Sequence, residues 1–284
     1  PTSFMEKVVA VGHLFKEYYS TLKVRAFRKH LAIYLFSFTA KDVYNTVFVF
    51  FCVYCLNVSS SLSGTLLSMS IVGLPVTLLA GVAIIKYGPS RLYVFAYTLM
   101  LLCLGGLFMV YQFPTDNKVT ILLVLAALYQ VGRCVLEFTP WNVFPFIPDV
   151  DRIMTRGDRA GIYAAVMTFF RKSTGAVASW IAGILLAEIG YNSKLMHTAA
   201  TTPADVQFGI AMIFFVGPVI LMLGALFLAF SFKLNRQTHG VLKDEITRLE
   251  EGGDKAKVTP QTRLVVEELT GHPYETLWPQ TPRI

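Results

Sequence analysis

The sequence contains few charged residues for its length. Asp, Glu, Lys and Arg make up 15% of the 284 residues, whereas an ordinary soluble domain holds about 25%. Hydrophobic residues make up 54% of the chain. This composition argues against an ordinary soluble domain and indicates an integral membrane protein.

Cysteine and histidine are also scarce, and neither is spaced for metal binding. The four cysteines lie inside apolar runs without a second C-x-x-C pair or a nearby histidine, and the five histidines are scattered. The motifs H-E-x-x-H and G-x-S-x-G are absent. We therefore expect no enzyme activity, no metal or other bound cofactor, and no nucleic-acid partner.

The two ends of the chain differ in composition from its middle. Nothing near Pro1 has the apolar core and cleavage site of a signal peptide, so we expect the chain to belong to a longer polypeptide. Residues 1–29 are amphipathic and basic, which predicts a cytoplasmic lead-in. Residues 233–284 are polar and predict a cytoplasmic tail, in which 241–251 forms a short amphipathic helix. The proline-rich end from Gly271 carries no packing signal.

Apolar stretches of about 20 or more residues, long enough to cross a bilayer roughly 30 Å thick, fill the region 30–232. The predicted spans are 30–56, 62–86, 90–112, 118–147, 160–190 and 206–232. The two ends and the loops 86–91 and 149–159 hold nearly all the Lys and Arg outside these spans. Because positive loops stay on the cytoplasmic side, both ends are predicted to be cytoplasmic. We expect an all-α protein of the plasma membrane, with a bacterial inner membrane as the setting.

Six spans with both ends on one side fit either a small channel or half of a twelve-span carrier built from two inverted three-helix repeats. The first spans of the two halves, 30–56 and 118–147, carry charges at mid-depth. The third spans, 90–112 and 206–232, carry none in their interiors. This pattern is expected if the first spans line a cavity and the third spans face lipid.

Six charged residues lie in the interiors of the predicted spans, away from their ends. A charge near the bilayer centre costs at least about 2.5 to 3.5 kcal/mol, so each needs a partner, a water-filled cavity or a cargo. They are Lys41, Asp42, Arg133, Glu137, Arg171 and Lys172. With a rise of 1.5 Å per residue, Asp42, Arg133 and Lys172 each lie roughly 18 to 22 Å from the cytoplasmic ends of their helices. We predict that they share one layer.

The pairing of these charges is only partly determined by their spacing. Arg133 and Glu137 are four residues apart, which suits an internal ion pair as well as it suits a substrate or gate role. Lys41 and Asp42 point about 100° apart and need separate partners. The two cations in excess require carboxylates from another half of the protein or an anionic cargo, unless some reach the membrane surface, a possibility that is strongest for Arg171.

Polar and aromatic residues accompany these charges. They include Tyr44, Asn45, Trp141 and Asn142. Thr168 lies on the same helical face as Lys172. Aromatic rings stack on the C–H groups of sugars while amides and charges bind the hydroxyls, so this lining suits a sugar, a glycoside or a sugar acid.

Several segments resemble a known family. The run from Pro140 to Asp151 (PWNVFPFIPDVD), a basic loop and the run from Thr168 to Ser173 (TFFRKS) resemble helices ten and eleven of the glycoside-pentoside-hexuronide:cation symporters, the family that includes melibiose permease. The stretch from Phe36 to Tyr54 is similar to helix seven of some members. The resemblance covers about residues 20–250. It implies the carboxyl-terminal six helices of a major facilitator superfamily transporter, with the amino-terminal six-helix half as partner.

The resemblance also implies roles for individual residues. Lys172 corresponds to the helix-eleven lysine of the family, near its cation and sugar sites. Asp149 corresponds to the aspartate that opens a cytoplasmic gating loop, with Arg152, Arg156 and Arg159 as candidate gate partners. The loop here lacks the acidic and aromatic run that is common after that aspartate. The cation-binding aspartates of the family lie in the amino-terminal half, so the choice between Na⁺ and H⁺ stays open.

The sequence therefore predicts a secondary transporter, surrounded by membrane lipid, that carries a sugar, glycoside or sugar acid together with a cation by alternating access. The excess of cations favours an anionic cargo. A non-transporting membrane scaffold or sensor that keeps the fold of half a carrier is the alternative.

Overall fold

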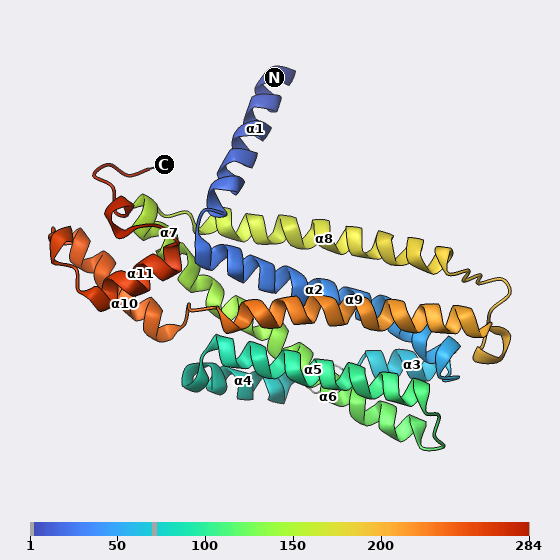
Figure 1. Ribbon diagram of the computed structural model, residues 1–284. Helices are drawn as coiled ribbons and strands as arrows, with labels where there is room; N and C mark the ends of the chain where they lie inside the picture. Colours follow the sequence, from blue (N-terminus) through green and yellow to red (C-terminus); the bar gives the residue numbers. More distant parts are fainter. Residues whose placement is uncertain (1–2, 70–72, 284) are drawn as a thin grey trace.

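Long helices form where the sequence is most apolar. The computed structural model describes residues 3–69 and 73–283, so residues 70–72 of the predicted span 62–86 lie outside the described residues. Five long helices run side by side (Figure 1): α2 (Arg25–Phe50), α5 (Pro89–Gln112), α6 (Lys118–Val143), α8 (Ala160–Glu188) and α9 (Ala204–Phe230). Each of these helices overlaps one of the predicted spans.

Shorter helices complete the bundle. A π-helical turn, η1 (Phe51–Cys55), extends α2, and α3 (Ser60–Leu67) and α4 (Gly73–Tyr87) cover the two described parts of the span 62–86. The chain reverses between α4 and α5 at Gly88, whose φ of 83° suits glycine because it has no Cβ. Pro89 then begins α5, since the first helical position needs no N–H donor.

Three of the described helical segments are long and apolar enough to cross a membrane: Pro89–Gln112, Lys118–Thr155 and Ala204–Phe230. The helix α4 is equally apolar in character but shorter. Although α2 and α8 are long enough, both carry charges in their middle. The middle of each of these two helices is therefore less apolar. Whether α2 and α8 can span a bilayer depends on what their charges pair with.

The core of the bundle lies where α2 packs on α9 and α5 packs on α6. The rings of Tyr44 on α2 and Tyr129 on α6 stack with their centroids 3.7 Å apart, and both side chains are fully buried. Phe214 of α9 packs against Tyr44 at 5.2 Å. The helices α5 and α6 approach closely at Gly132, where an added Cβ would lie 2.5 Å from Met100. Aromatic stacking and one glycine thus hold four helices together.

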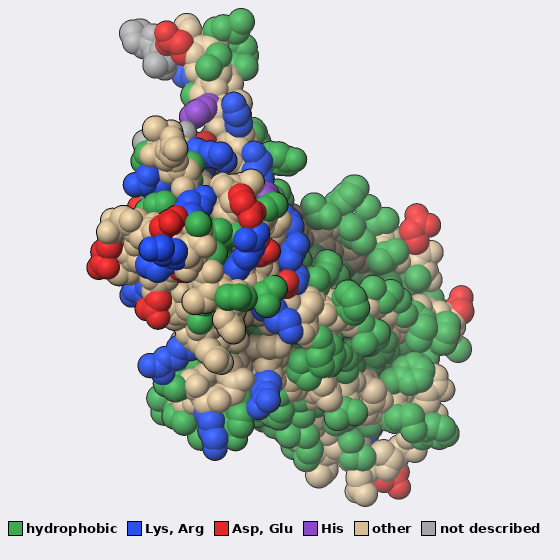
Figure 2. Space-filling view, turned by 60° about the vertical axis from the view of Figure 1, so that its left-hand side comes forward, with side chains coloured by type: hydrophobic (Ala, Val, Ile, Leu, Met, Phe, Trp, Pro, Cys, Tyr) green, Lys and Arg blue, Asp and Glu red, His purple; other side chains and the backbone are tan. Residues whose placement is uncertain are grey.

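A second layer of helices covers one end of the bundle. It contains α7 (Ile147–Thr155), α10 (Arg236–Glu250) and α11 (Pro260–Thr270), and α1 (Phe4–Thr21) projects from the same end. Figure 2 shows Lys and Arg side chains gathered over this layer, while hydrophobic side chains cover the visible surface of the long helices. We call this the basic end; the loops 57–59, 113–117 and 190–203 form the opposite end.

The tail is packed more fully than the sequence predicts. The predicted helix 241–251 belongs to the longer α10, and the segment after Gly271 is not without packing: Tyr274 and Leu277 are each 2% exposed. The Tyr274 hydroxyl donates to Glu245 of α10. The prediction missed this docking because two isolated apolar residues among prolines have no periodicity.

Candidate functional site

Three of the predicted intramembrane charges meet between α2 and α6. Lys41 Nζ lies 2.9 Å from Glu137 Oε1, and Arg133 Nη1 lies 3.8 Å from the same oxygen. The pairing of Arg133 with Glu137 follows from their spacing of four residues on one helix. Lys41 is the closer partner, however, and it comes from another helix. One carboxylate therefore faces two cations, and the cluster carries a positive excess.

Asp42 forms a separate pair with Arg171 of α8. The guanidinium donates two hydrogen bonds to the carboxylate, of 2.7 and 2.9 Å, in the fork geometry that makes such pairs strong. Gly175 makes room for it, because an added Cβ there would lie 3.0 Å from Arg171 Nη1. Lys41 and Asp42 thus have separate partners, as predicted. Arg171 reaches this partner instead of the membrane surface.

The ring of Phe38 connects the two ion-pair groups. Lys41 Nζ lies 4.6 Å from its centroid, and the Arg171 guanidinium carbon lies 5.1 Å from it. Both distances suit cation–π attraction. We call Lys41, Asp42, Arg133, Glu137 and Arg171, with Phe38 between them, the charged layer.

Lys172 lies beside the charged layer but outside its pairs. Its side chain is exposed, and none of the described residues forms an ion pair with it. Thr168, one turn earlier, is exposed as well, and its hydroxyl donates to the Ala164 carbonyl within α8. This face of α8 is open, because α8 packs mainly on α2 and little on α9.

The predicted aromatic and amide residues lie in different surroundings. Trp141 is 46% exposed and packs edge-on against Tyr34, near Phe38. Asn142 donates to the Phe138 carbonyl of its own helix, and Asn45 is half-buried one turn beyond Lys41. Tyr44 requires a correction: its ring is enclosed in the aromatic core, so it does not line an open face.

The predicted gate partners do not pair with Asp149. Asp149 Oδ2 lies 2.6 Å from His239 Nε2 of α10, and the imidazole stacks on Phe146 with centroids 4.2 Å apart. Arg152 instead pairs with Glu250 of α10. The prediction assumed a free loop, whereas the segment forms α7 and docks on the tail, which supplies the partners.

Arg159 pairs with Asp151, a residue that the sequence analysis left out. Two guanidinium nitrogens donate to its carboxylate at 2.8 and 3.1 Å, and the Tyr163 hydroxyl donates at 2.6 Å. The Asp151 side chain is 1% exposed. Burial alone would lower the pKa of Arg159, but the bonds to Asp151 outweigh it and raise that pKa. This buried pair fixes the connection between α7 and α8.

The end of the tail is fastened to the end of α7. Arg156, in the left-handed region at φ 62°, donates to the carbonyls of Pro279 and Gln280 and stacks over the Trp278 ring at 4.7 Å. The Trp278 amide donates to the Ile153 carbonyl at 2.7 Å. The third candidate gate arginine therefore holds the tail.

Glu245 anchors the tail from α10. Burial would raise the pKa of its carboxyl, but hydrogen bonds from Arg248 and Tyr274 outweigh burial and lower it. Burial, together with the Glu245 charge, raises the pKa of Tyr274. Glu245 is therefore a charged, buried acceptor of hydrogen bonds within the docked tail.

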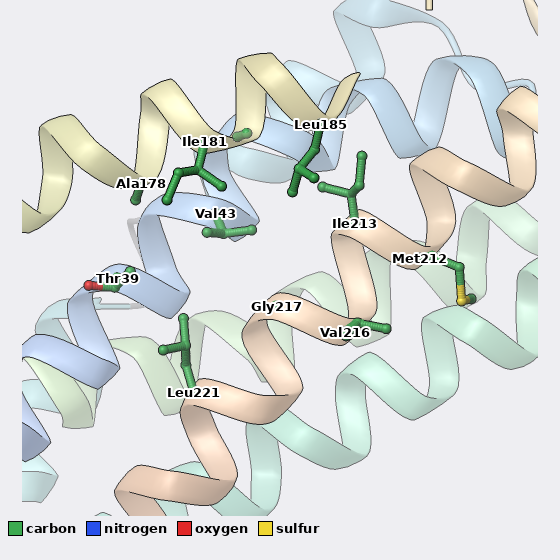
Figure 3. A pocket seen from close by; sticks show the side chains of 11 residues that line it. Thr39, Val43, Ala178, Ile181, Leu185, Met212, Ile213, Val216, Gly217 and Leu221 are labelled. Atoms are coloured by element: carbon green, nitrogen blue, oxygen red, sulfur yellow. The ribbon is translucent and has the colours of Figure 1, made fainter. Parts of the chain in front are cut away.

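Hollows also lie outside the charged layer. A groove of about 470 Å³ between α2, α8 and α9 has Thr39 as its one hydroxyl and is otherwise apolar (Figure 3), which does not suit a sugar. A hollow of about 660 Å³ at the opposite end combines the rings of Tyr54 and Tyr191 with Asn57 and His197. The sequence analysis missed this second hollow because its residues come from three separate segments.

No group of three or more His, Cys, Asp or Glu side chains suited to holding a metal ion occurs within residues 3–69 and 73–283. The cysteines Cys52, Cys103 and Cys134 are buried as free thiols.

Comparison with known proteins identifies the class. A family model described as MFS/sugar transport protein matches residues 10–236. An uncharacterized symporter of Synechocystis sp. is 24% identical over 229 residues, which are 78% of this chain and 40% of that protein. Proteins named "Putative sulfoquinovose importer" are 23% identical in Salmonella typhimurium (64% of this chain, 37% of that protein) and 27% identical in Escherichia coli (41% and 24%).

The chain spans 40% or less of the length of these relatives. Apolar helices with paired charges between them agree with a membrane protein of this class. Because the family model covers well over half of the sequence, the protein belongs to the MFS/sugar transport protein family.

Proposed function

We propose that this chain is the carboxyl-terminal, six-helix half of a cation-coupled symporter of the glycoside-pentoside-hexuronide type. The observation that carries the proposal is the charged layer with the exposed Lys172 beside it. A lysine in the middle of a spanning helix is costly against lipid, so it needs a carboxylate, a wet cavity or an anionic cargo on its open side. None of the described residues fills this role. The missing counter-charge then comes from an amino-terminal half or from the cargo.

The arrangement of the helices supports two inverted repeats. In this interpretation α2 and α6 are the first helices of the two repeats, and the ion pair between Lys41 and Glu137 joins them. A site between repeats, near the bilayer midplane, is where such carriers bind substrate and coupling ion. Both ends of the chain would then lie on the cytoplasmic side of the membrane, at the basic end.

The cargo we propose is an anionic sugar. The charged layer and Lys172 hold four cations against two carboxylates, and two of the relatives are named for sulfoquinovose, a sugar with a sulfonate group. Trp141 and Asn142 are exposed at the edge of the layer and could stack on the ring and bind hydroxyls. The coupling cation, Na⁺ or H⁺, would bind between the two halves.

Uptake of labelled sulfoquinovose and of a labelled hexuronide by cells that express the protein tests the proposal. Lys172→Ala should lower uptake at least tenfold, and Lys172→Arg should keep part of it because the charge remains. Lys243→Ala, on the exposed side of α10, is the matched control and should leave uptake unchanged. Uptake that is equal in all variants would contradict the proposed role, and the absence of uptake of either sugar would favour a scaffold or sensor.

A further inference from the structure

The helix α1 stands away from the bundle with an apolar face that the described residues leave largely uncovered. Figure 1 shows α1 running across the direction of the long helices, at the basic end. Its 18 residues span about 27 Å. Phe4 is 82% exposed, Val8 50% and Phe15 54%. So much exposed apolar surface on one helix requires a covering phase or partner.

Five of the apolar side chains of α1 share one face, whereas Met5, Val9 and Leu14 lie about 80° to 120° from its centre. Measured at about 100° per residue from Phe15, Phe4, Val8, Val11 and Tyr19 all lie within about 40°. Tyr18 lies about 60° away. The apolar face therefore continues along the whole helix.

The charges of α1 are arranged around that face in a definite order. Lys7 and Lys16 lie about 80° and 100° to either side of Phe15, whereas Glu6 and Glu17 lie within about 20° of the opposite direction. Lysines at the borders of an apolar face can keep their stems in hydrocarbon and their ammonium groups among lipid headgroups. Carboxylates on the far side then point into water.

Contacts with α8 fix which way the apolar face points. The rings of Phe15 and Tyr18 lie 6.4 and 6.0 Å from Phe169, measured between centroids. Phe169 lies nine residues, or about 13 Å, into α8 from its start at Ala160. The apolar face of α1 therefore points along α8, from the basic end toward the middle of the bundle, and away from the tail.

We propose that α1 lies in the surface of the membrane, with its apolar face in the acyl boundary of a leaflet rich in anionic lipid. An amphipathic helix with basic borders binds such a surface through buried apolar area and attraction to headgroup phosphates. Lys23 and Arg28, which follow α1 and are exposed, extend the positive charge along the same leaflet. This proposal depends on the membrane setting of the family and not on the proposed cargo.

Spin labels on the full-length protein in lipid nanodiscs test this orientation. A label at Val8→Cys, in a background without the native cysteines, should be several-fold more accessible to oxygen than to a water-soluble nickel chelate. Ala10→Cys is the matched control, because Ala10 lies about 140° from Phe15 and should show the reverse preference. Two labels equally accessible to nickel would overturn the proposal. So would a Val8 label protected from both reagents, which would indicate a protein partner such as a second copy of the chain.

The lipid charge is tested with phosphatidylglycerol–phosphatidylcholine nanodiscs against pure phosphatidylcholine. The preference of the Val8 label for oxygen over the nickel chelate should be stronger in the anionic nanodiscs. It should weaken in 1 M salt, because the electrostatic screening length is about 3 Å there and about 10 Å at 0.1 M. Lys7→Gln with Lys16→Gln should remove the difference between the lipids, whereas Lys243→Gln with Lys257→Gln in the tail should keep it. Should a cysteine variant not fold, amide exchange of α1 in the unsubstituted chain replaces it. Slower exchange in the anionic lipid supports the proposal, and equal rates overturn it.

Discussion

The pair between Asp42 and Arg171 should make a large electrostatic contribution to the stability of the bundle. The two side chains are 20% and 23% exposed, and two hydrogen bonds join them. Removing one partner of a buried pair costs about 3 to 5 kcal/mol, because the other charge stays buried alone. Since this pair keeps some exposure, we expect about 3 kcal/mol for Arg171→Leu or Asp42→Leu.

That cost corresponds to a melting temperature lowered by about 6 to 12 °C, at about 2 to 4 °C per kcal/mol. The double variant, Asp42→Leu with Arg171→Leu, should recover most of the loss because no charge is left unpaired. In a Cys55→Ser background, a dye that reacts with thiols measures unfolding directly, since Cys52, Cys103 and Cys134 are buried until the bundle opens.

The matched control is the more exposed pair between Arg152 and Glu250, whose side chains are 46% and 38% exposed. Glu250→Gln should shift the melting temperature by at most a few degrees, because exposed pairs contribute about 0 to 1 kcal/mol. A double variant of Asp42 and Arg171 as unstable as the sum of its single variants would refute the reasoning. Single variants with unchanged melting temperatures would refute it equally.

Three further predictions concern packing and the tail. Gly132→Ala should cost about 1 to 3 kcal/mol because its Cβ would overlap Met100, whereas Gly105→Ala, with nothing within 4 Å, should be neutral in the same dye assay. Because docking lowers the pKa of Glu245, its carboxylate stabilises the docked tail above pH 4.5, which is its pKa in the unfolded chain. This contribution is lost as the pH falls through the folded-state pKa. Cleavage of the tail by pepsin should accelerate over that range, and less steeply in Glu245→Gln; equal pH dependence would contradict this. Arg156→Ala should speed proteolysis after residue 277 without lowering the melting temperature, and Lys257→Ala should change neither; an unchanged rate in Arg156→Ala would show that Arg156 does not fasten the tail.

The sequence predicts the helices well because each depends on a long apolar run. The described helices α5, α6, α8 and α9 lie close to the predicted spans, and α2 begins at Arg25, five residues before the predicted start. Two features escaped this reasoning. The π-helical turn at Phe51–Cys55 and the separate α3 and α4 interrupt apolar stretches that composition alone reads as continuous.

The partners of the charges were predictable only where they lie on one helix. The spacing of four residues allowed the pair of Arg133 and Glu137 as one of two interpretations, and the divergent directions of Lys41 and Asp42 required separate partners. The choice of Glu137 for Lys41, and of Arg171 for Asp42, depends on how α2, α6 and α8 pack. The partner of Asp149 was not predictable for the same reason, because His239 lies 90 residues away in the sequence, on the docked tail.

The central claim is that Lys172 faces a water-filled passage rather than lipid. Lys172→Cys in a Cys55→Ser background, treated in the membrane with a charged, impermeant methanethiosulfonate reagent, tests it most directly, because the remaining native thiols Cys52, Cys103 and Cys134 are buried. Phe227→Cys is the control for lipid exposure, since Phe227 is 77% exposed on the apolar surface of α9. The account predicts modification of Lys172→Cys and none of Phe227→Cys. Failure of the reagent to modify Lys172→Cys, as at Phe227→Cys, would contradict it.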